Sequence, residues 1–269
     1  MAKVYCICPD IKHMTKYKVT VITLDPTSKR VMSLGDSIVQ QSISVQFFDA
    51  IDGRQSYPQV SNDEILDQNQ SILRRFTPLT SGEVGCYLSH FRAIKQAYEN
   101  GQDRLCLLED DISINDNFTF ILEQIFELPE EFEFVRLMGL KRHKYKVIKS
   151  LEGNVNLVRP IKGLCGTQGY TINRRGMEKI IAKGSRIYEP IDKFYDHFWD
   201  TDLQCYAVEP HIIKEVPRPT TVAKPDMVKA NKPLAKRLKK EWIKFKRSID
   251  RRRYIAAHRD EFYPLKKVR

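Results

Sequence analysis

A strand, a helix and a second strand follow one another within about 30 residues near the start of this chain. Residues 18–24 are rich in β-branched side chains and stop at Asp25-Pro26, residues 27–41 have helical character, and residues 45–48 form another short apolar run. Such a βαβ unit places its two strands side by side and parallel. With 269 residues, 42% of them hydrophobic, the chain can bury such a sheet, which excludes disordered and fibrous classes. We predict an α/β domain with a mostly parallel central sheet.

Three consecutive carboxylates, Glu109-Asp110-Asp111, come directly after the apolar run at residues 105–108. Adjacent negative charges at the end of a buried strand repel one another unless a cation or water relieves them. In an extended segment Glu109 and Asp111 would share a face, and Asp110 would oppose them. Carboxylate oxygens with open positions beside them suit Mg²⁺ or Mn²⁺ holding a substrate diphosphate. The alternative is a solvated turn ahead of a helix that starts near residues 115–117.

A capping box at Thr80 and Glu83 predicts the start of a helix that ends at Asn100-Gly101. One face of this helix is apolar. The other face carries small or polar residues, which would let backbone or a ligand approach closely; they are Gly82, Cys86, Ser89, His90 and Ala93.

Residues 190–202 gather aspartates, a histidine and aromatic side chains. This combination suits a sugar site, because aromatic rings stack on the apolar face of a pyranose and carboxylates accept hydroxyl protons. The alternative is an amphipathic helix with an acidic outer face.

The order of these pieces resembles glycosyltransferase family 25 of lipooligosaccharide biosynthesis, which includes beta-1,4-galactosyltransferase-like enzymes. The most specific part is GEVGCYLSH at residues 82–90, followed about twenty residues later by Glu109-Asp110-Asp111. Weaker pieces stand in the same order, and the resemblance covers roughly residues 19–210; these pieces are Leu24-Asp25 with Arg30, then residues 50–53, 166–170 and 190–192.

The resemblance implies a GT-A type, Rossmann-like nucleotide-sugar-binding domain and an inverting transfer of a hexose. The expected donor is UDP-galactose, with UDP-glucose as the alternative. Glu109-Asp110-Asp111 would be the Asp-x-Asp-type motif, with Asp111 and Glu109 at Mn²⁺ or Mg²⁺. The implied donor-binding residues are Thr23, Leu24, Asp25, Arg30, Ala50, Asp52, Ser89, His90, Glu109, Asp110, Gly166 and Gln168.

An acceptor hydroxyl attacks at neutral pH only if a base takes its proton, so an inverting enzyme needs a carboxylate on the face opposite the leaving group. We predict Asp192 as this base and Asp196 as the second candidate. A third metal ligand stays open between His197 and His211.

The formal net charge of +11 is concentrated at the C-terminal end. Residues 224–269 hold 17 basic and 5 acidic residues, which leaves 28 basic and 29 acidic residues in residues 1–223. Apolar residues recur there at helical spacing among the lysines and arginines; they are Leu234, Leu238, Trp242, Phe245 and Ile249. Such a helix suits an anionic membrane surface. The alternatives are that its apolar stripe packs on the body, or that the charges bind nucleic acid, which no recognised motif supports.

We therefore predict two parts, a GT-A type glycosyltransferase domain at residues 1–223 and a basic amphipathic helical tail at residues 224–269. No apolar run is long enough to span a bilayer, the start has too short an apolar core for a signal peptide, and the cysteines favour free thiols in a reducing compartment. The expectation is a bacterial cytoplasmic protein, peripheral at the inner face of the cytoplasmic membrane. Its partners would be a UDP-sugar, a lipid-linked oligosaccharide acceptor and the anionic membrane surface, with no nucleic acid.

Overall fold

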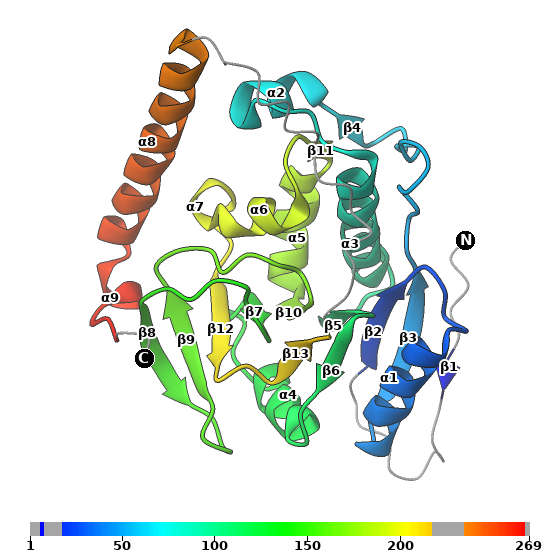
Figure 1. Ribbon diagram of the computed structural model, residues 1–269. Helices are drawn as coiled ribbons and strands as arrows, with labels where there is room; N and C mark the ends of the chain where they lie inside the picture. The colour runs from blue at the N-terminus through cyan, green and yellow to red at the C-terminus, as the bar shows by residue number, and fades with distance from the viewer. Residues whose placement is uncertain (1–5, 8–17, 217–233, 267–269) are drawn as a thin grey trace.

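A nine-stranded mixed sheet forms the centre of the molecule in the computed structural model (Figure 1). The structure describes residues 6–7, 18–216 and 234–266. The strand order is β1-β3-β2-β5-β10-β7-β12-β9-β8. These strands are β1 (Cys6–Ile7), β2 (Lys18–Thr23), β3 (Ser44–Asp49), β5 (Arg104–Glu109), β7 (Phe134–Arg136), β8 (Tyr145–Ser150), β9 (Asn156–Pro160), β10 (Gly169–Asn173) and β12 (Cys205–Glu209). The predicted α/β class is confirmed, but three of the eight strand pairings are parallel and five are antiparallel, so the sheet is mixed and not mostly parallel as expected.

The predicted βαβ unit is present at the start of the sheet. β2 and β3 pair in parallel and are connected by α1 (Lys29–Gln40), and β5 lies parallel on the other side of β2. The carboxyl ends of these three strands therefore meet at one edge of the sheet. β7 and β12 form a second parallel pair, and β10 runs antiparallel between β5 and β7. Because β10 is reversed, its first residue, Gly169, lies opposite Leu108 at the carboxyl end of β5.

Helices cover both faces of the sheet, and successive residues of β5 point to opposite sides. Cys106 and Leu108 belong to the core beneath α1 and α4 (Phe118–Phe126). Leu105 and Leu107 belong to the core beneath α3 (Ser81–Glu99) and α5 (Arg174–Gly184). The strand that leads into the three carboxylates is thus buried on both faces.

The start of α3 has the predicted capping box. The Thr80 hydroxyl accepts a hydrogen bond from the Glu83 amide at 3.2 Å, and the Glu83 carboxylate accepts one from the Thr80 amide at 2.8 Å. The expected close approach to the small-residue face is made by backbone. A Cβ atom on Gly85 would lie 2.6 Å from the Ile51 carbonyl oxygen. The segment after β3 therefore packs directly on α3.

Two short ribbons and several short helices complete the molecule; the ribbon of β6 and β13 lies near α4 in Figure 1, and the other elements lie in the upper part. β6 (Ile112–Ile114) pairs antiparallel with β13 (Ile213–Glu215), so that Glu215 lies opposite Ile112. The remaining elements are β4 (Ile65–Leu66), which pairs with β11 (Arg186–Ile187), and the helices α2 (Gln68–Arg75), α6 (Ile191–Asp196) and α7 (Phe198–Thr201).

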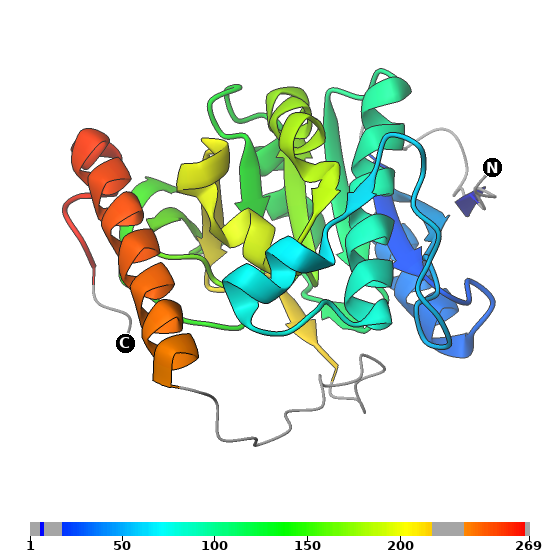
Figure 2. The ribbon, with the colours of Figure 1, turned by 90° about the horizontal axis from the view of Figure 1, so that it is seen from above.

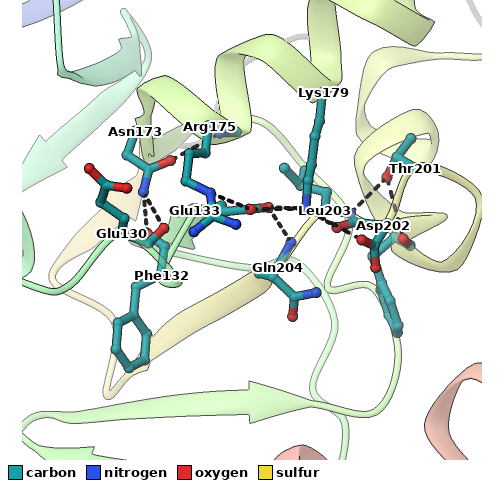
Figure 3. A network of polar contacts seen from close by, with 12 residues as sticks. Glu130, Phe132, Glu133, Asn173, Arg175, Lys179, Thr201, Asp202, Leu203 and Gln204 are labelled. Atoms are coloured by element: carbon teal, nitrogen blue, oxygen red, sulfur yellow. Dashed lines mark hydrogen bonds and ion pairs between the residues drawn. The ribbon is translucent and has the colours of Figure 1, made fainter. Parts of the chain in front are cut away.

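A buried carboxylate ties the start of β7 to its surroundings (Figure 3). Glu133 is 1% exposed. It accepts hydrogen bonds from the Lys179 ammonium at 2.9 Å and from the Gln204 amide at 3.0 Å, and the Arg175 guanidinium lies 3.8 Å away. A buried charge of this kind is tolerated only when it is paired, so these contacts fix α5 and the segment before β12 against β7.

The C-terminal residues form α8 (Leu234–Ala257) and α9 (Arg259–Phe262), which lie along the outer side of the molecule in both ribbon views (Figures 1 and 2). The predicted helix is confirmed. The second half of α8 packs on the body through Ile255, and α9 packs there through Phe262; both residues are buried in a cluster with Phe198. The predicted boundary between residues 223 and 224 lies outside the described residues. Among the helices that the structure describes, none has the length and apolarity needed to cross a membrane.

Candidate functional site

The three carboxylates lie where β5 ends. Glu109 is the last residue of the strand, and Asp110 and Asp111 form the turn into β6. Because the carboxyl end of β2 lies beside that of β5, residues at the end of the first predicted strand come next to this turn.

Asp110 is held by two residues of the βαβ unit. The Thr23 hydroxyl donates a hydrogen bond to its carboxylate at 2.6 Å, and the Arg30 guanidinium pairs with the same oxygen at 2.5 Å. Thr23 and Arg30, both expected at the donor site, are thus brought to the acidic motif. Leu24 and Asp25 follow Thr23 at the strand end; Leu24 is exposed, and Asp25 accepts hydrogen bonds within its own turn.

Glu109 points toward α3 and β10. Its carboxylate lies 3.2 Å from Nε2 of His90 and accepts a hydrogen bond from the Thr167 hydroxyl. Burial alone would raise the pKa of Glu109, but the hydrogen bond and charge of His90, together with Thr167, hold it below its usual value. His90 is itself buried, and its Nδ1 lies 3.0 Å from the Tyr170 hydroxyl. His90 therefore fixes Glu109, and both of its ring nitrogens are engaged.

Asp111 differs from its two neighbours. Its Oδ1 atom is buried and has no hydrogen-bond partner within the described residues. Burial, followed by the charges of Glu109, Asp110 and Glu215, raises the pKa of Asp111 to about 6. Glu215 is a site residue that the sequence did not indicate. It reaches this position only through the pairing of β13 with β6, which lies about a hundred residues away in the chain.

Two further polar atoms near the carboxylates lack a partner in the described residues: Oε1 of Gln168 and Nε of Arg30. Gln168 faces Glu109 across the β10–β5 pairing, and its carbonyl accepts the Glu109 amide at 2.9 Å. Gly166 has a φ of 79°, and a Cβ atom there would lie 2.2 Å from Oε1 of Gln168. The positive φ favours a glycine at this turn, and the expected contact of Gly166 with the donor stays a prediction.

Ser89, Ala50 and Asp52 have structural contacts. The Ser89 hydroxyl accepts the Ile51 amide at 2.8 Å and donates to the Gly85 carbonyl at 2.7 Å, and its side chain is buried. Both of these hydrogen bonds are made within the protein, and the expected place of Ser89 near the donor stays a prediction. The Ala50 amide donates to the Thr23 carbonyl, whereas Asp52 pairs with Arg54 in an exposed turn.

The two candidate bases lie on α6 and have different surroundings. The Asp196 carboxylate accepts a hydrogen bond from the Arg136 guanidinium at 2.9 Å and one from the Cys165 amide at 3.2 Å, and Lys193 lies 3.3 Å away. Asp196 is thus buried and holds the glycine-containing segment before β10 in place. A carboxylate with these contacts is poorly suited to accept a proton from an acceptor hydroxyl. Asp192 is partly exposed and pairs with Lys193 at 3.3 Å. Its charge also opposes ionisation of Glu109, which places it on the side of the carboxylate motif.

The histidines considered as third ligand are engaged elsewhere. His197 lies 3.0 Å from the buried Glu189 carboxylate. His211 follows β12 at the end of the β6–β13 ribbon farther from Asp111, and its Nε2 lies 3.9 Å from the Glu209 carboxylate.

The donor set fits a hard divalent cation. The Oδ1 atom of Asp111 has no hydrogen-bond partner in the described residues, and burial and nearby carboxylates raise the pKa of Asp111. Both features are expected of a carboxylate cluster whose negative charge no cation neutralises. Among the described residues, ligand atoms lie within 4.8 Å of one another in two groups, Cys86-His90-Glu109 and Cys165-Asp192-Asp196, and neither group includes Asp111. A hydrogen bond already joins His90 to Glu109, so the first of these groups supports the motif.

Comparisons with known proteins agree with this arrangement. The model of glycosyltransferase family 25 (LPS biosynthesis protein) matches residues 16–195. The inactive glycosyltransferase 25 family member 3 of Mus musculus is 28% identical over 214 residues, which are 72% of this chain and 36% of the relative. Procollagen galactosyltransferase 2 of Mus musculus is 26% identical over 204 residues, 66% of this chain and 31% of the relative. A Haemophilus influenzae protein, named only provisionally as a glycosyltransferase, is 27% identical over 188 residues, 66% of this chain and 64% of the relative.

The chain spans about a third of the length of the animal relatives that it matches. The matched family region contains the βαβ unit, the capped helix α3, the three carboxylates and most of α6. The chain therefore belongs to glycosyltransferase family 25.

Proposed function

We propose that this protein is a metal-assisted, inverting hexosyltransferase that uses a UDP-sugar, with galactose as the transferred sugar. The observation that carries the proposal is the carboxylate motif at the end of β5. Asp110 and Glu109 are each held by neighbouring side chains, whereas Asp111 presents a buried oxygen without a partner in the described part of the chain. Because one relative is named inactive, family membership alone does not establish transfer, and the intact motif is the specific support for activity.

Asp111 is the residue proposed to hold Mn²⁺ or Mg²⁺ directly, with Glu109 as the second carboxylate. A divalent cation bound there supplies Lewis acidity that neutralises the leaving diphosphate. Arg30 and Thr23 keep Asp110 in place, and the buried Nε of Arg30 has no hydrogen-bond partner among the described residues. The remaining residues proposed to surround the donor are Leu24, Asp25, Ala50, Asp52, Gly166 and Gln168.

Asp192 is proposed as the base that removes the acceptor proton. Its charge opposes ionisation of Glu109, so Asp192 lies close enough to act on the motif. Asp192 is also partly exposed and is not held in a buried ion pair. Asp196 positions the segment that precedes β10 through Arg136 and the Cys165 amide. As the acceptor hydroxyl attacks the anomeric carbon, its proton passes to Asp192 and the bond to UDP breaks, which inverts the configuration.

The acceptor is proposed to be a lipid-linked oligosaccharide of lipooligosaccharide or lipopolysaccharide synthesis, at the cytoplasmic face of a bacterial membrane. The description of the matching family as LPS biosynthesis proteins supports this choice. The name procollagen galactosyltransferase, carried by a relative, supports galactose as the sugar.

The test is a screen of UDP-sugars with Mn²⁺, in which hydrolysis and transfer are followed by release of UDP. UDP-galactose is expected to be consumed, and Asp111→Asn or EDTA should abolish the reaction. Asp116→Asn serves as the control, because Asp116 is an exposed aspartate five residues away. Consumption of UDP-glucose alone would favour the alternative donor. Absence of UDP release from every donor, or full activity of Asp111→Asn, would contradict the proposal.

A further inference from the structure

The first half of α8 carries apolar side chains that do not pack on the protein. Leu238 is 63% exposed, Trp242 is 64% exposed and Phe245 is 55% exposed. The rings of Trp242 and Phe245 lie 5.9 Å apart, so they form one continuous surface. We call Leu238, Trp242 and Phe245 the apolar stripe. Exposed large apolar patches on a soluble domain mark interaction sites.

The helix is attached to the body through its opposite side. The Arg247 guanidinium lies 3.4 Å from the Glu189 carboxylate, the Tyr254 hydroxyl donates to Asp202 at 2.9 Å, and Ile255 is buried. Residues of an α-helix follow one another at about 100°, which places Arg247 and Tyr254 across the helix from the apolar stripe and Ile255 about 100° to one side of it. The stripe is therefore directed away from the protein by the contacts that hold α8.

Positive charge surrounds the apolar stripe. The exposed basic residues described on this helix are Lys239, Lys244, Lys246, Arg252 and Arg253. Lys239, Lys246 and Arg253 lie along one border of the stripe at helical spacing. The only acidic side chain described on the exposed part, Glu241, is paired with Lys244 at 2.8 Å. A second copy of this helix would bring like charges together, whereas a bilayer with anionic headgroups complements both the charge and the aromatic edge.

We propose that the apolar stripe and its basic border are a docking surface for a membrane of anionic phospholipids. The helix lies in the interface, with Trp242 and Phe245 inserted among the headgroups and the lysines paired with lipid phosphates. Arg247 joins this helix directly to Glu189, three residues before Asp192, so docking holds the acceptor side of the site at the lipid surface. The biological role of this surface rests on the proposed function, but lipid binding itself requires neither the donor nor the acceptor.

The experiment is vesicle flotation with the full chain, without any sugar nucleotide. Vesicles contain phosphatidylcholine alone or with about a third phosphatidylglycerol. Wild type is expected to float with the anionic vesicles. The Trp242→Ser/Phe245→Ser variant should bind at least tenfold more weakly, and loss of each bordering lysine should weaken binding about fivefold. Phe120→Ser is the matched control, because Phe120 is an exposed phenylalanine on α4, 44% exposed, and its variant should float like wild type.

Several outcomes would overturn the proposal: failure of wild type to float, unchanged binding of the double variant, or equal binding to neutral and anionic vesicles. A dimer that dissociates in the double variant, without vesicle binding, would assign the stripe to a second copy of the chain. Binding of a DNA duplex without vesicle binding would assign the charges to nucleic acid. UDP release by the same preparations, measured without lipid, keeps these outcomes separate from failure of the proposed transfer.

Discussion

Asp111→Asn should have opposite effects on stability and on function. Because the Asp111 pKa rises from an ordinary value of 3.8 to about 6, its charge opposes folding once it ionises. The folded state binds more protons than the unfolded state between these values, so stability falls as the pH rises from about 4 to 6. The difference corresponds to roughly 3 kcal/mol at pH 7. Partial solvent access reduces this to about 1–2 kcal/mol. The neutral amide removes this cost.

Metal-free Asp111→Asn should therefore melt about 3–6 °C higher than wild type at pH 7, with the advantage disappearing near pH 4. Mn²⁺ should raise the melting temperature of wild type and leave that of the variant unchanged. Asp110→Asn is the matched neighbour, and it should be less stable than wild type because it weakens the contacts with Thr23 and Arg30. A metal-free Asp111→Asn protein that melts below wild type, or that Mn²⁺ stabilises equally, would refute the assignment.

Five further substitutions test the roles assigned above. Asp192→Asn should lower kcat by about 10²–10⁴ with little change in urea unfolding. Asp196→Asn should cost about 3 kcal/mol of stability, because the buried Arg136 loses its counter-ion. Equal stability of the two variants would contradict these two roles. Glu133→Ala should cost about 3–5 kcal/mol and the exposed Glu130→Ala within about 0.5 kcal/mol, measured by the same unfolding. Phe262→Ala should cost about 3–5 kcal/mol if the C-terminal segment is part of the core, and a smaller loss would show that it is not.

Local patterns predicted the elements that carry the site. The β-branched run before Asp25 and the apolar run before Glu109 are strands because each is buried between helices on both faces of the sheet. The capping box at Thr80 fixed the start of α3 because it satisfies backbone groups within four residues. Each of these signals depends on neighbours in the chain, which a single sequence displays directly.

Local sequence patterns could not predict contacts between segments that are distant in the chain. Ser89 was predicted near the donor, but its hydroxyl accepts a hydrogen bond from the Ile51 amide, which belongs to the loop after β3. Asp196 looked equivalent to Asp192 until Arg136, on β7, was found to pair with it. Glu215 comes to the motif through the β6–β13 ribbon. In each case the deciding partner lies far away in the sequence, and no spacing rule relates the two positions.

For the C-terminal helix, the sequence pattern likewise predicted the helix but not the direction in which its apolar face points. The spacing of Leu238, Trp242 and Phe245 predicted one apolar face, but a periodic pattern does not say whether that face meets the protein or another phase. The alternative that it packs on the body is wrong for these three residues, because they stay more than half exposed while Ile255 and Phe262 carry the attachment. Removing residues 231–269 would therefore delete part of the core together with the exposed stripe. Only substitutions within the stripe separate a loss of membrane contact from a loss of folding.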